Sequence, residues 1–497
     1  MLIPVIDLFA GPGGLNEGFN RTRDVRGRRV FGTVISVECD PFAHRTLELR
    51  ALFRKLAERG DLDDYLRYTR GEITRDELMR RAGDLAQSAA EEAMQARLGD
   101  PAHDREIEAR IRRALRRAGS GECVLIGGPP CQAYSLVGRA RRRNDATFAE
   151  DHKHVLYREY LRIVGLFRPA VFLMENVPGL LSAKFQGAGT FDMICADLRS
   201  AGYTVHALGD GAESDDPRRF VVRADEHGVP QSRARIFLLG LRADLKLAAA
   251  PLMRPDPGVI HTVADVVSDL PAIRSRLSKG GGDSGPAWAA EIARAFTPRR
   301  IAAMEPVVAG RLAHELSGLR TDLPLGAPHM ERARGGPRAL REWYEDAPCG
   351  VLNHNSRGHM ASDLHRYMYW AAYGAVHHRS PTLHDVPAFL LPEHANVGRD
   401  PDTMPFGDRF RVQLGKRPST TVVSHIAKDG HYYIHPSARQ CRSLSVREAA
   451  RLQTFPDSYL FEGPITEQYK QVGNAVPPWL ASRLGALVHG ILTGRAP

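Results

Sequence analysis

Residues 5–19 read Val-Ile-Asp-Leu-Phe-Ala-Gly-Pro-Gly-Gly-Leu-Asn-Glu-Gly-Phe, and this stretch decides the fold. The apolar run at 5–9 predicts a buried strand, the glycines predict a turn, and a helix then leads to a β-branched run at 34–37. Glycines between a strand and a helix let a ligand approach the backbone, although a plain turn is the alternative. The third glycine position of a dinucleotide fingerprint is Asn16, which argues against NAD.

Strand and helix signals alternate through the first half of the chain. Further strands are predicted at 124–126, 171–174 and 236–239, with helical stretches such as 154–167 between them. This alternation predicts an α/β fold with a mostly parallel, doubly wound sheet. Residues 41–118 are rich in Leu, Ala, Arg and Glu, and they predict a helical insertion within this first domain.

The regular pattern ends near residue 265. Residues 266–435 contain a Gly-rich run, several Pro breaks and three of the four Trp, which predicts a second, smaller and variable domain. Helical patterns return in 436–497, where Ser445 followed by Glu448 predicts a capping box. We therefore divide the chain into 1–265, 266–435 and 436–497.

Composition limits the class of protein. The chain has 497 residues, enough for two or three cored domains, with 43% hydrophobic and 25% charged residues, as in soluble globular proteins. No run approaches the roughly 20 apolar residues of a membrane helix and no basic-then-apolar leader is seen, so we expect a cytoplasmic protein. Six cysteines without a CxxC pair, and no HExxH, lead us to expect neither disulfides nor a metal.

Charge points to a polyanionic partner. The net charge is +10, and 60 of the 68 basic residues are arginine, which a GC-rich genome would also explain. The position of the arginines is more informative than their number. Arg139, Arg141, Arg142 and Arg143 directly follow Cys131, where a phosphate backbone would pass.

Three further motifs carry reactive side chains. Ile126-Gly-Gly-Pro-Pro-Cys131 displays a thiol on a Gly/Pro turn after an apolar strand, although inert packing is the usual role of a lone cysteine. Glu175 ends the apolar run in Phe172-Leu-Met-Glu-Asn-Val-Pro178, where a helix-capping acid is the alternative. Gln231-Ser-Arg-Ala-Arg235 places two arginines on one face of a strand.

These motifs, in this order, resemble the DNA (cytosine-5)-methyltransferase family. Asp7–Gly14 resembles the family's opening block, and residues 442–456 and 470–478 resemble its last two blocks. The resemblance implies a Rossmann-like S-adenosylmethionine-dependent methyltransferase sheet to which both chain ends contribute. It also implies that 266–435 is the target recognition domain, and that no metal takes part.

The resemblance implies a cofactor pocket for S-adenosylmethionine, which leaves as S-adenosylhomocysteine. Phe9 would stack on the adenine and Glu38 would hold the ribose. An Asp for the adenine amino group is expected, and Asp61 fits by spacing with Asp100 as its rival. The remaining pocket residues would be Gly11, Gly13, Pro130, Asn474 and Val476.

The resemblance also assigns the chemistry. Cys131 would add to the cytosine ring, Glu175 would hold N3 and the exocyclic amine, Arg235 would contact O2, and Arg233 would contact the thiolate or a phosphate. The base must leave the duplex to be reached, and the Arg139–Arg143 loop would close over it. Asn353-His354-Asn355-Ser-Arg357 is a candidate for reading base edges.

The expected function is therefore sequence-specific methylation of DNA cytosine at C5, as the modifying half of a bacterial restriction–modification system. We expect a monomer acting on nucleoid DNA, with a cognate restriction endonuclease as potential partner. Two alternatives remain. A tRNA cytosine methyltransferase typically has a smaller variable region than the about 170 residues found here. A silent DNA-binding regulator would require loss of a catalytic residue, and all four are present.

Overall fold

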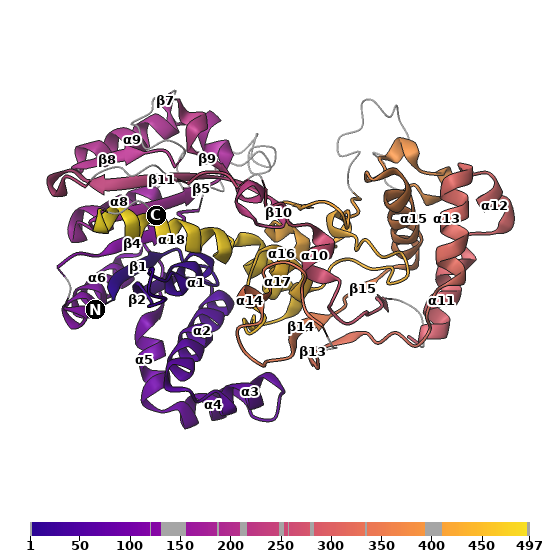
Figure 1. Cartoon of the computed structure of the whole chain (residues 1–497), viewed down its shortest axis with the longest axis horizontal. Helices are drawn as coiled ribbons and strands as arrows, with labels where there is room; N and C mark the ends of the chain where they lie inside the picture. The colour runs from indigo at the N-terminus through magenta and orange to yellow at the C-terminus, as the bar shows by residue number, and fades with distance from the viewer. Residues whose placement is uncertain are drawn as a thin grey trace.

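The computed structural model describes residues 2–119, 121–130, 156–185, 188–208, 216–247, 253–256, 258–278, 283–332, 335–392 and 410–494. Cys131 and the predicted loop Arg139–Arg143 lie outside these residues. Figure 1 shows a lobe built around a large sheet and a mostly helical lobe, with α16 (Val446–Leu452) and α17 (Ile465–Asn474) between them.

One eight-stranded sheet organises the first lobe. Its strand order is β3-β2-β1-β4-β5-β11-β8, and β9 (Val221–Arg223) also pairs with β11. The first five strands in this order run parallel, whereas β11 is antiparallel to both β5 and β8. The strands are β1 (Ile3–Leu8), β2 (Phe31–Glu38), β3 (Ala93–Gln95), β4 (Val124–Gly127), β5 (Val171–Asn176), β8 (Tyr203–His206) and β11 (Ala234–Arg242). The predicted α/β fold with a mostly parallel sheet is confirmed.

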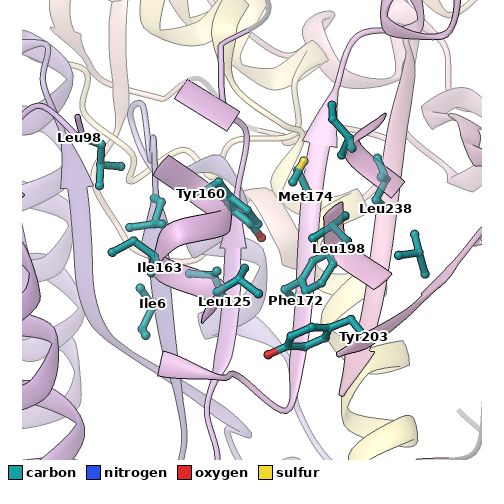
Figure 2. Packing of buried hydrophobic residues seen from close by; sticks show 14 of the residues in the cluster. Ile6, Leu98, Leu125, Tyr160, Ile163, Phe172, Met174, Leu198, Tyr203 and Leu238 are labelled. Atoms are coloured by element: carbon teal, nitrogen blue, oxygen red, sulfur yellow. The ribbon is translucent and has the colours of Figure 1, made fainter. Parts of the chain in front are cut away.

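Helices cover both faces of this sheet, so its strands are apolar on both sides. Figure 2 shows one face, where Ile6, Leu125 and Phe172 from the strands meet Tyr160 from α8 (Leu156–Phe167) and Leu198 from α9 (Thr190–Ser200). The opposite face is covered by α1 (Gly14–Arg21) and α18 (Pro478–Thr493). Both ends of the chain therefore belong to the sheet lobe, as Figure 1 shows.

Residues 41–118 are not purely helical. They form α2 (Pro41–Arg59), α3 (Asp63–Thr69), α4 (Arg75–Ala82), α5 (Asp84–Glu92), then β3 and α6 (Pro101–Ala118). The expectation of helices alone is wrong at β3, which pairs with β2 and forms the edge of the sheet. Three residues are too few for an alternating pattern to be visible in the sequence. The helices that are inserted into the alternating pattern of strands and helices are therefore α3, α4 and α5.

These three helices, which we call the α3–α5 insert, contact a loop from the far end of the chain. Tyr65 donates a hydrogen bond to the Ser458 carbonyl at 2.7 Å, and Tyr68 donates to Glu462 at 2.7 Å. Arg75 also donates to Glu462, at 3.0 Å. The insert is thus bonded to the segment that joins α16 to α17.

The second lobe is built around α15 (Ala361–His377), whose inner residues are almost completely buried. Trp288, Leu312 and Ile434 pack against it. Its other helices and strands are β12 (Arg276–Leu277), α11 (Gly285–Arg294), α12 (Pro298–Ala302), α13 (Pro306–Ser317) and β15 (Gly358–His359). A further group packs around α16 and α17 and consists of α10 (Val263–Val267), β13 (Gly326–Met330), α14 (Arg341–Tyr344) and β14 (Val351–Asn355). The division into three segments remains a prediction.

The predicted capping box begins α16. The Ser445 hydroxyl accepts from the Glu448 amide at 3.2 Å, and the Glu448 carboxylate accepts from the Ser445 amide at 2.7 Å. Glu448 also receives two hydrogen bonds from the buried Arg442, at 2.6 and 2.7 Å. Although burial alone would raise it, this guanidinium holds the pKa of Glu448 well below its usual range.

The packing of α18 on α1 leaves no space for larger side chains. A methyl group at Gly18 would lie 2.3 Å from the Ala481 Cβ and 2.5 Å from the Pro478 carbonyl oxygen. A methyl group at Gly14 would lie 2.2 Å from the Val476 carbonyl oxygen. Glycine at these positions is therefore required by the approach of the C-terminal segment.

We predict that Gly18→Ala lowers the free energy of unfolding by about 1–3 kcal/mol, because the added methyl group overpacks the α1–α18 contact. Gly310→Ala is the matched control, since Gly310 lies inside α13 with no atom within 4 Å of the added methyl group. That control should gain about 0.5–1 kcal/mol from helix propensity. Urea unfolding followed by circular dichroism measures both, and equal shifts would contradict the packing argument.

Candidate active site

The glycine turn after β1 has an unusual backbone. Gly11 and Gly13 have positive φ angles of 55° and 95°, and Phe9, which is not glycine, has a φ of 55°. A non-glycine residue in the left-handed region is strained, and such strain clusters at functional sites. No atom lies within 4 Å of the position a methyl group would take on Gly11, so the backbone there faces open space.

Glu38 fixes this turn from the neighbouring strand. Its carboxylate accepts hydrogen bonds from the amides of Gly11 and Asp40, both at 2.7 Å. The Asp40 side chain in turn caps the start of α2. Each oxygen of a carboxylate can accept a second hydrogen bond, so Glu38 retains the capacity to hold the hydroxyl groups of a ligand.

The segment leading to Cys131 leaves the sheet at the same edge. β4 lies beside β1 with Gly127 opposite Leu8, so residues 127–130 follow strand ends next to the glycine turn. The Asn176 amide donates to the Pro129 carbonyl at 3.3 Å and holds this segment. Pro130, the last described residue before Cys131, is exposed.

Glu175 and Arg235 meet at this edge. The Arg235 Nε lies 2.9 Å from the Glu175 Oε1, and both side chains are more than four-fifths buried. Burial lowers the Arg235 pKa, and the Glu175 carboxylate acts against that shift. The other Glu175 oxygen lies 2.8 Å from where a methyl group on Gly128 would be. The ion pair therefore contacts the backbone segment that carries Cys131.

The Arg233 side chain lies inside the protein. It is buried, and its guanidinium donates to the carbonyls of Val422 at 2.8 Å and Gly473 at 3.4 Å. Burial lowers the Arg233 pKa well below its usual value. The predicted contact with a thiolate or a phosphate remains a prediction, because Cys131 lies outside the described residues. In the described part of the chain, Arg233 ties two distant segments to the strand that carries Arg235.

Two buried glutamines extend this connection, and no sequence motif predicted their role. The Gln231 amide donates to the Leu452 carbonyl and to the Gln453 Oε1, both at 3.1 Å. Gln453 donates to the carbonyls of Val472 at 2.7 Å and Ala475 at 3.2 Å. We call Gln231, Arg233 and Gln453 the polar hub. It holds the end of α17 beside β11, the strand that carries Arg235.

The residues after α17 complete the glycine turn. The Val476 carbonyl lies against Gly14, and Asn474 is exposed next to it. The Tyr459 hydroxyl also donates a hydrogen bond to the Pro12 carbonyl. Residues from both ends of the chain thus form one surface, as expected for Asn474 and Val476, whose contact with a cofactor remains a prediction.

The structure corrects the assignment of Asp61. This residue is exposed and follows the C-terminal end of α2, whose 19 residues span about 28 Å at 1.5 Å per residue. Most of the residues between Glu38 and Asp61 form this helix, which carries Asp61 away from the edge of the sheet where Glu38 lies. Asp100 lies five residues after β3, in which Gln95 is paired with Glu38. Its side chain caps α6 through the Ala102 amide at 3.0 Å.

The cluster at 353–357 is also corrected. Asn353 is buried and bonds both the amide and the carbonyl of Phe461. His354 is buried between the Ser445 hydroxyl and the Pro271 carbonyl, both at 2.8 Å. Arg357 stacks on Tyr469 at 4.0 Å. Asn353 and His354 are therefore structural, and they cannot read base edges in this conformation.

A doubly wound α/β sheet with a glycine turn after β1, an acid ending β2 and an acid–arginine pair at the same edge defines an α/β enzyme that binds a nucleotide-containing cofactor. The family model for C-5 cytosine-specific DNA methylase matches residues 121–280 and 368–488. The protein belongs to this family, and it is a DNA (cytosine-5)-methyltransferase.

Individual relatives agree with this assignment. The chain is 33% identical to type II methyltransferase M.Bpa9945I of Bacillus paralicheniformis over 99% of each chain. It is 29% identical to type II methyltransferase M.AgeI of Thalassovita gelatinovora, over 76% of this chain and 85% of the relative. The solved structure of a prophage-encoded DNA modification methyltransferase (E. coli) matches with a TM-score of 0.53 at 19% identity, over 99% of each chain, and supports the fold.

Membership in this family implies the use of S-adenosylmethionine. The open backbone at Gly11, the carboxylate of Glu38 and the strained Phe9 fit such a ligand. Within the described part of the chain, no three His, Cys, Asp or Glu side chains are grouped to hold a metal ion. No helix in the described ranges has the length and apolar character needed to span a bilayer.

We predict that acid destabilises the fold through His354. Burial lowers its pKa from 6.5 to about 4. Between pH 6.5 and about 4, the unfolded chain therefore binds a proton at His354 that the folded protein does not bind. Stability that is present above pH 6.5 is lost as the pH falls towards 4. At pH 5 this loss amounts to about 2 kcal/mol.

Urea unfolding at pH 7 and pH 5 measures the loss. The variant His354→Gln, which keeps a donor for the Pro271 carbonyl, should lose less stability between these pH values than the wild type. His227, whose pKa burial also lowers to about 4, should leave some pH dependence in the variant. An unchanged difference between the two pH values would show that His354 is not responsible.

Proposed function

We propose that the protein methylates C5 of a cytosine flipped out of duplex DNA, at a specific sequence, through a covalent bond between Cys131 and the base. The observation that carries this proposal is the Glu175–Arg235 pair, which contacts the backbone leading to Cys131. The pair lies at the sheet edge that also carries the glycine turn. A nucleophile, an acid and a cation would thus converge on one base.

The residues divide the chemistry as follows. The Cys131 thiolate adds to C6 of the ring and makes C5 nucleophilic. Glu175 holds the N3 and amine edge, and Arg235 holds O2, so that charge arising in the ring is stabilised. The cofactor supplies an electrophilic methyl group. Transfer of the C5 proton to solvent water then restores the ring double bond and breaks the bond between C6 and the sulfur, which leaves as a thiolate.

We assign cofactor contacts to the glycine turn and its neighbours. Asp100 replaces Asp61 as the candidate for the adenine amino group, because it follows the strand paired with β2. The other residues of the pocket would be Phe9, Gly11, Gly13, Glu38, Pro130, Asn474 and Val476. The bound cofactor would lie where the two ends of the chain meet.

The DNA partner would be held outside this pocket. Arg139, Arg141, Arg142 and Arg143 would close over the flipped base and contact phosphates, and residues 266–435 would read the sequence. Relatives named type II methyltransferases support a role in a bacterial restriction–modification system, with a cognate endonuclease acting on the same site. Such an enzyme would act as a monomer on nucleoid DNA in the cytoplasm.

The test of the activity uses labelled S-adenosylmethionine with unmethylated genomic DNA or bulk tRNA. We expect 5-methylcytosine in DNA at one sequence, which bisulfite-type sequencing identifies. Label in tRNA alone would replace the DNA assignment with an RNA one. Label in neither nucleic acid would favour a silent DNA-binding regulator.

The covalent step has its own test. Cys131→Ala should reduce kcat on the order of a thousandfold or more while DNA binding persists. Cys195→Ala, which removes a buried thiol in α9, should retain activity. An oligonucleotide with 5-fluorocytosine at the target should remain attached to Cys131 in mass spectra. Attachment to another residue, or turnover by Cys131→Ala, would rule out this route.

The cofactor assignment is tested by two matched variants. Asp100→Asn keeps a side chain that can cap α6 but removes the carboxylate, and should weaken S-adenosylmethionine binding about tenfold in calorimetry. Asp61→Asn should bind as the wild type does. The reverse result would restore the assignment made by spacing alone.

A further inference from the structure

Asp7 is an unusual residue in the floor of the glycine turn. It lies near the carboxyl end of β1, two residues before Phe9, and its side chain is fully buried. Among the described residues, neither of its carboxylate oxygens has a hydrogen-bond partner. A buried carboxylate without partners is very costly when charged, and it reduces this cost by taking up a proton.

The polar neighbours of Asp7 make their shortest hydrogen bonds to other groups and not to its carboxylate. The Asn16 amide donates to the Ser36 hydroxyl at 2.7 Å, and the Asn16 Oδ1 accepts from Asn20 at 2.5 Å. Asn16 lies in the first turn of α1 and Ser36 lies on β2, opposite Asp7 in the sheet register. The shortest hydrogen bonds of these neighbours are thus made among themselves and not to Asp7.

The charged groups around Asp7 also oppose its ionisation on balance. Burial raises the pKa of Asp7 well above its usual value, and Glu38 on β2 raises it further. Arg54 on α2 lowers it, as do Asn16 and Ser36. Arg54 is itself paired with Glu92. Two tyrosine hydroxyls, of Tyr160 and Tyr459, also interact electrostatically with Asp7, and burial favours their neutral forms.

We propose that Asp7 carries a proton in the free protein and releases it to solvent when S-adenosylmethionine binds at the glycine turn. The O–H bond of the carboxyl group breaks, the proton passes to the buffer, and the carboxylate that remains offsets the positive charge of the cofactor. No electron is transferred. This inference depends on the proposed function, because it requires that cofactor in this turn.

The consequence is a difference between cofactor and product. S-adenosylmethionine carries a sulfonium charge that S-adenosylhomocysteine lacks. A cationic ligand favours the ionised form of a nearby acid, whereas a ligand without that charge favours it less. Binding of the cofactor should therefore release more protons than binding of the product, and cofactor affinity should rise with pH below the pKa of Asp7 in the free protein.

The experiment is calorimetry of S-adenosylmethionine binding in phosphate and in Tris at one pH near neutrality. The difference between the two binding enthalpies reports the protons released. We expect net release of protons when the wild type binds the cofactor, and less release when it binds S-adenosylhomocysteine. Asp7→Asn, which replaces the acid with a neutral group of the same shape, should release almost none and should favour the cofactor over the product about tenfold less than the wild type.

Asp24→Asn is the matched control, because Asp24 is a carboxylate in the turn before β2 that bonds the Arg26 and Arg28 amides. It should release protons as the wild type does. Cofactor binding and methyl transfer without proton release by the wild type would overturn the role of Asp7 and leave the proposed function intact. Undiminished release by Asp7→Asn would also overturn it. Absence of cofactor binding would instead overturn the proposed function.

Discussion

The approach of the Val476 carbonyl to Gly14 is the contact on which the active site depends. It brings a segment from the end of the chain against the first turn of the first helix, and a single methyl group would prevent it. Contacts between residues this distant in sequence are entropically expensive to form. The packing of α18 on the sheet stabilises this closure, so the cofactor surface exists only when the whole chain has folded.

The polar hub extends this constraint to β11, the strand that carries Arg235. Gln231, Arg233 and Gln453 are buried and satisfy backbone carbonyls of segments far apart in sequence. Unpaired buried carbonyls are costly, so each side chain fixes the path of the chain that it bonds. The strand that presents Arg235 and the segment beside the glycine turn therefore have one fixed relative position.

The sequence predicted those parts of the structure that local patterns determine. The strand, turn and helix at the start, the order of strands and helices, and the Ser445 capping box all follow from neighbouring residues. Glu175 lies near the end of β5, as its position at the end of an apolar run predicted.

Predictions failed where contacts between residues far apart in the sequence determine the position of a side chain. The hydrogen bonds of Arg233 to two carbonyls were not predicted, because its local sequence is the same whether the side chain faces a ligand or the protein interior. Asp61 was predicted from its spacing after Glu38, but most of the residues between the two form α2. Asn353 and His354 have side chains of the kind that read base edges, but in the structure they bond Phe461 and Ser445 instead. β3 is too short to show any periodicity.

The α3–α5 insert has a consequence for engineering. Tyr65, Tyr68 and Arg75 attach it to the loop that leads from α16 to α17, between the two lobes. A chimera that received the second lobe of a relative together with its α16–α17 segment would leave these three side chains facing a foreign loop. Transplantation of sequence preference would therefore succeed best when the insert and the loop at 458–462 are exchanged together.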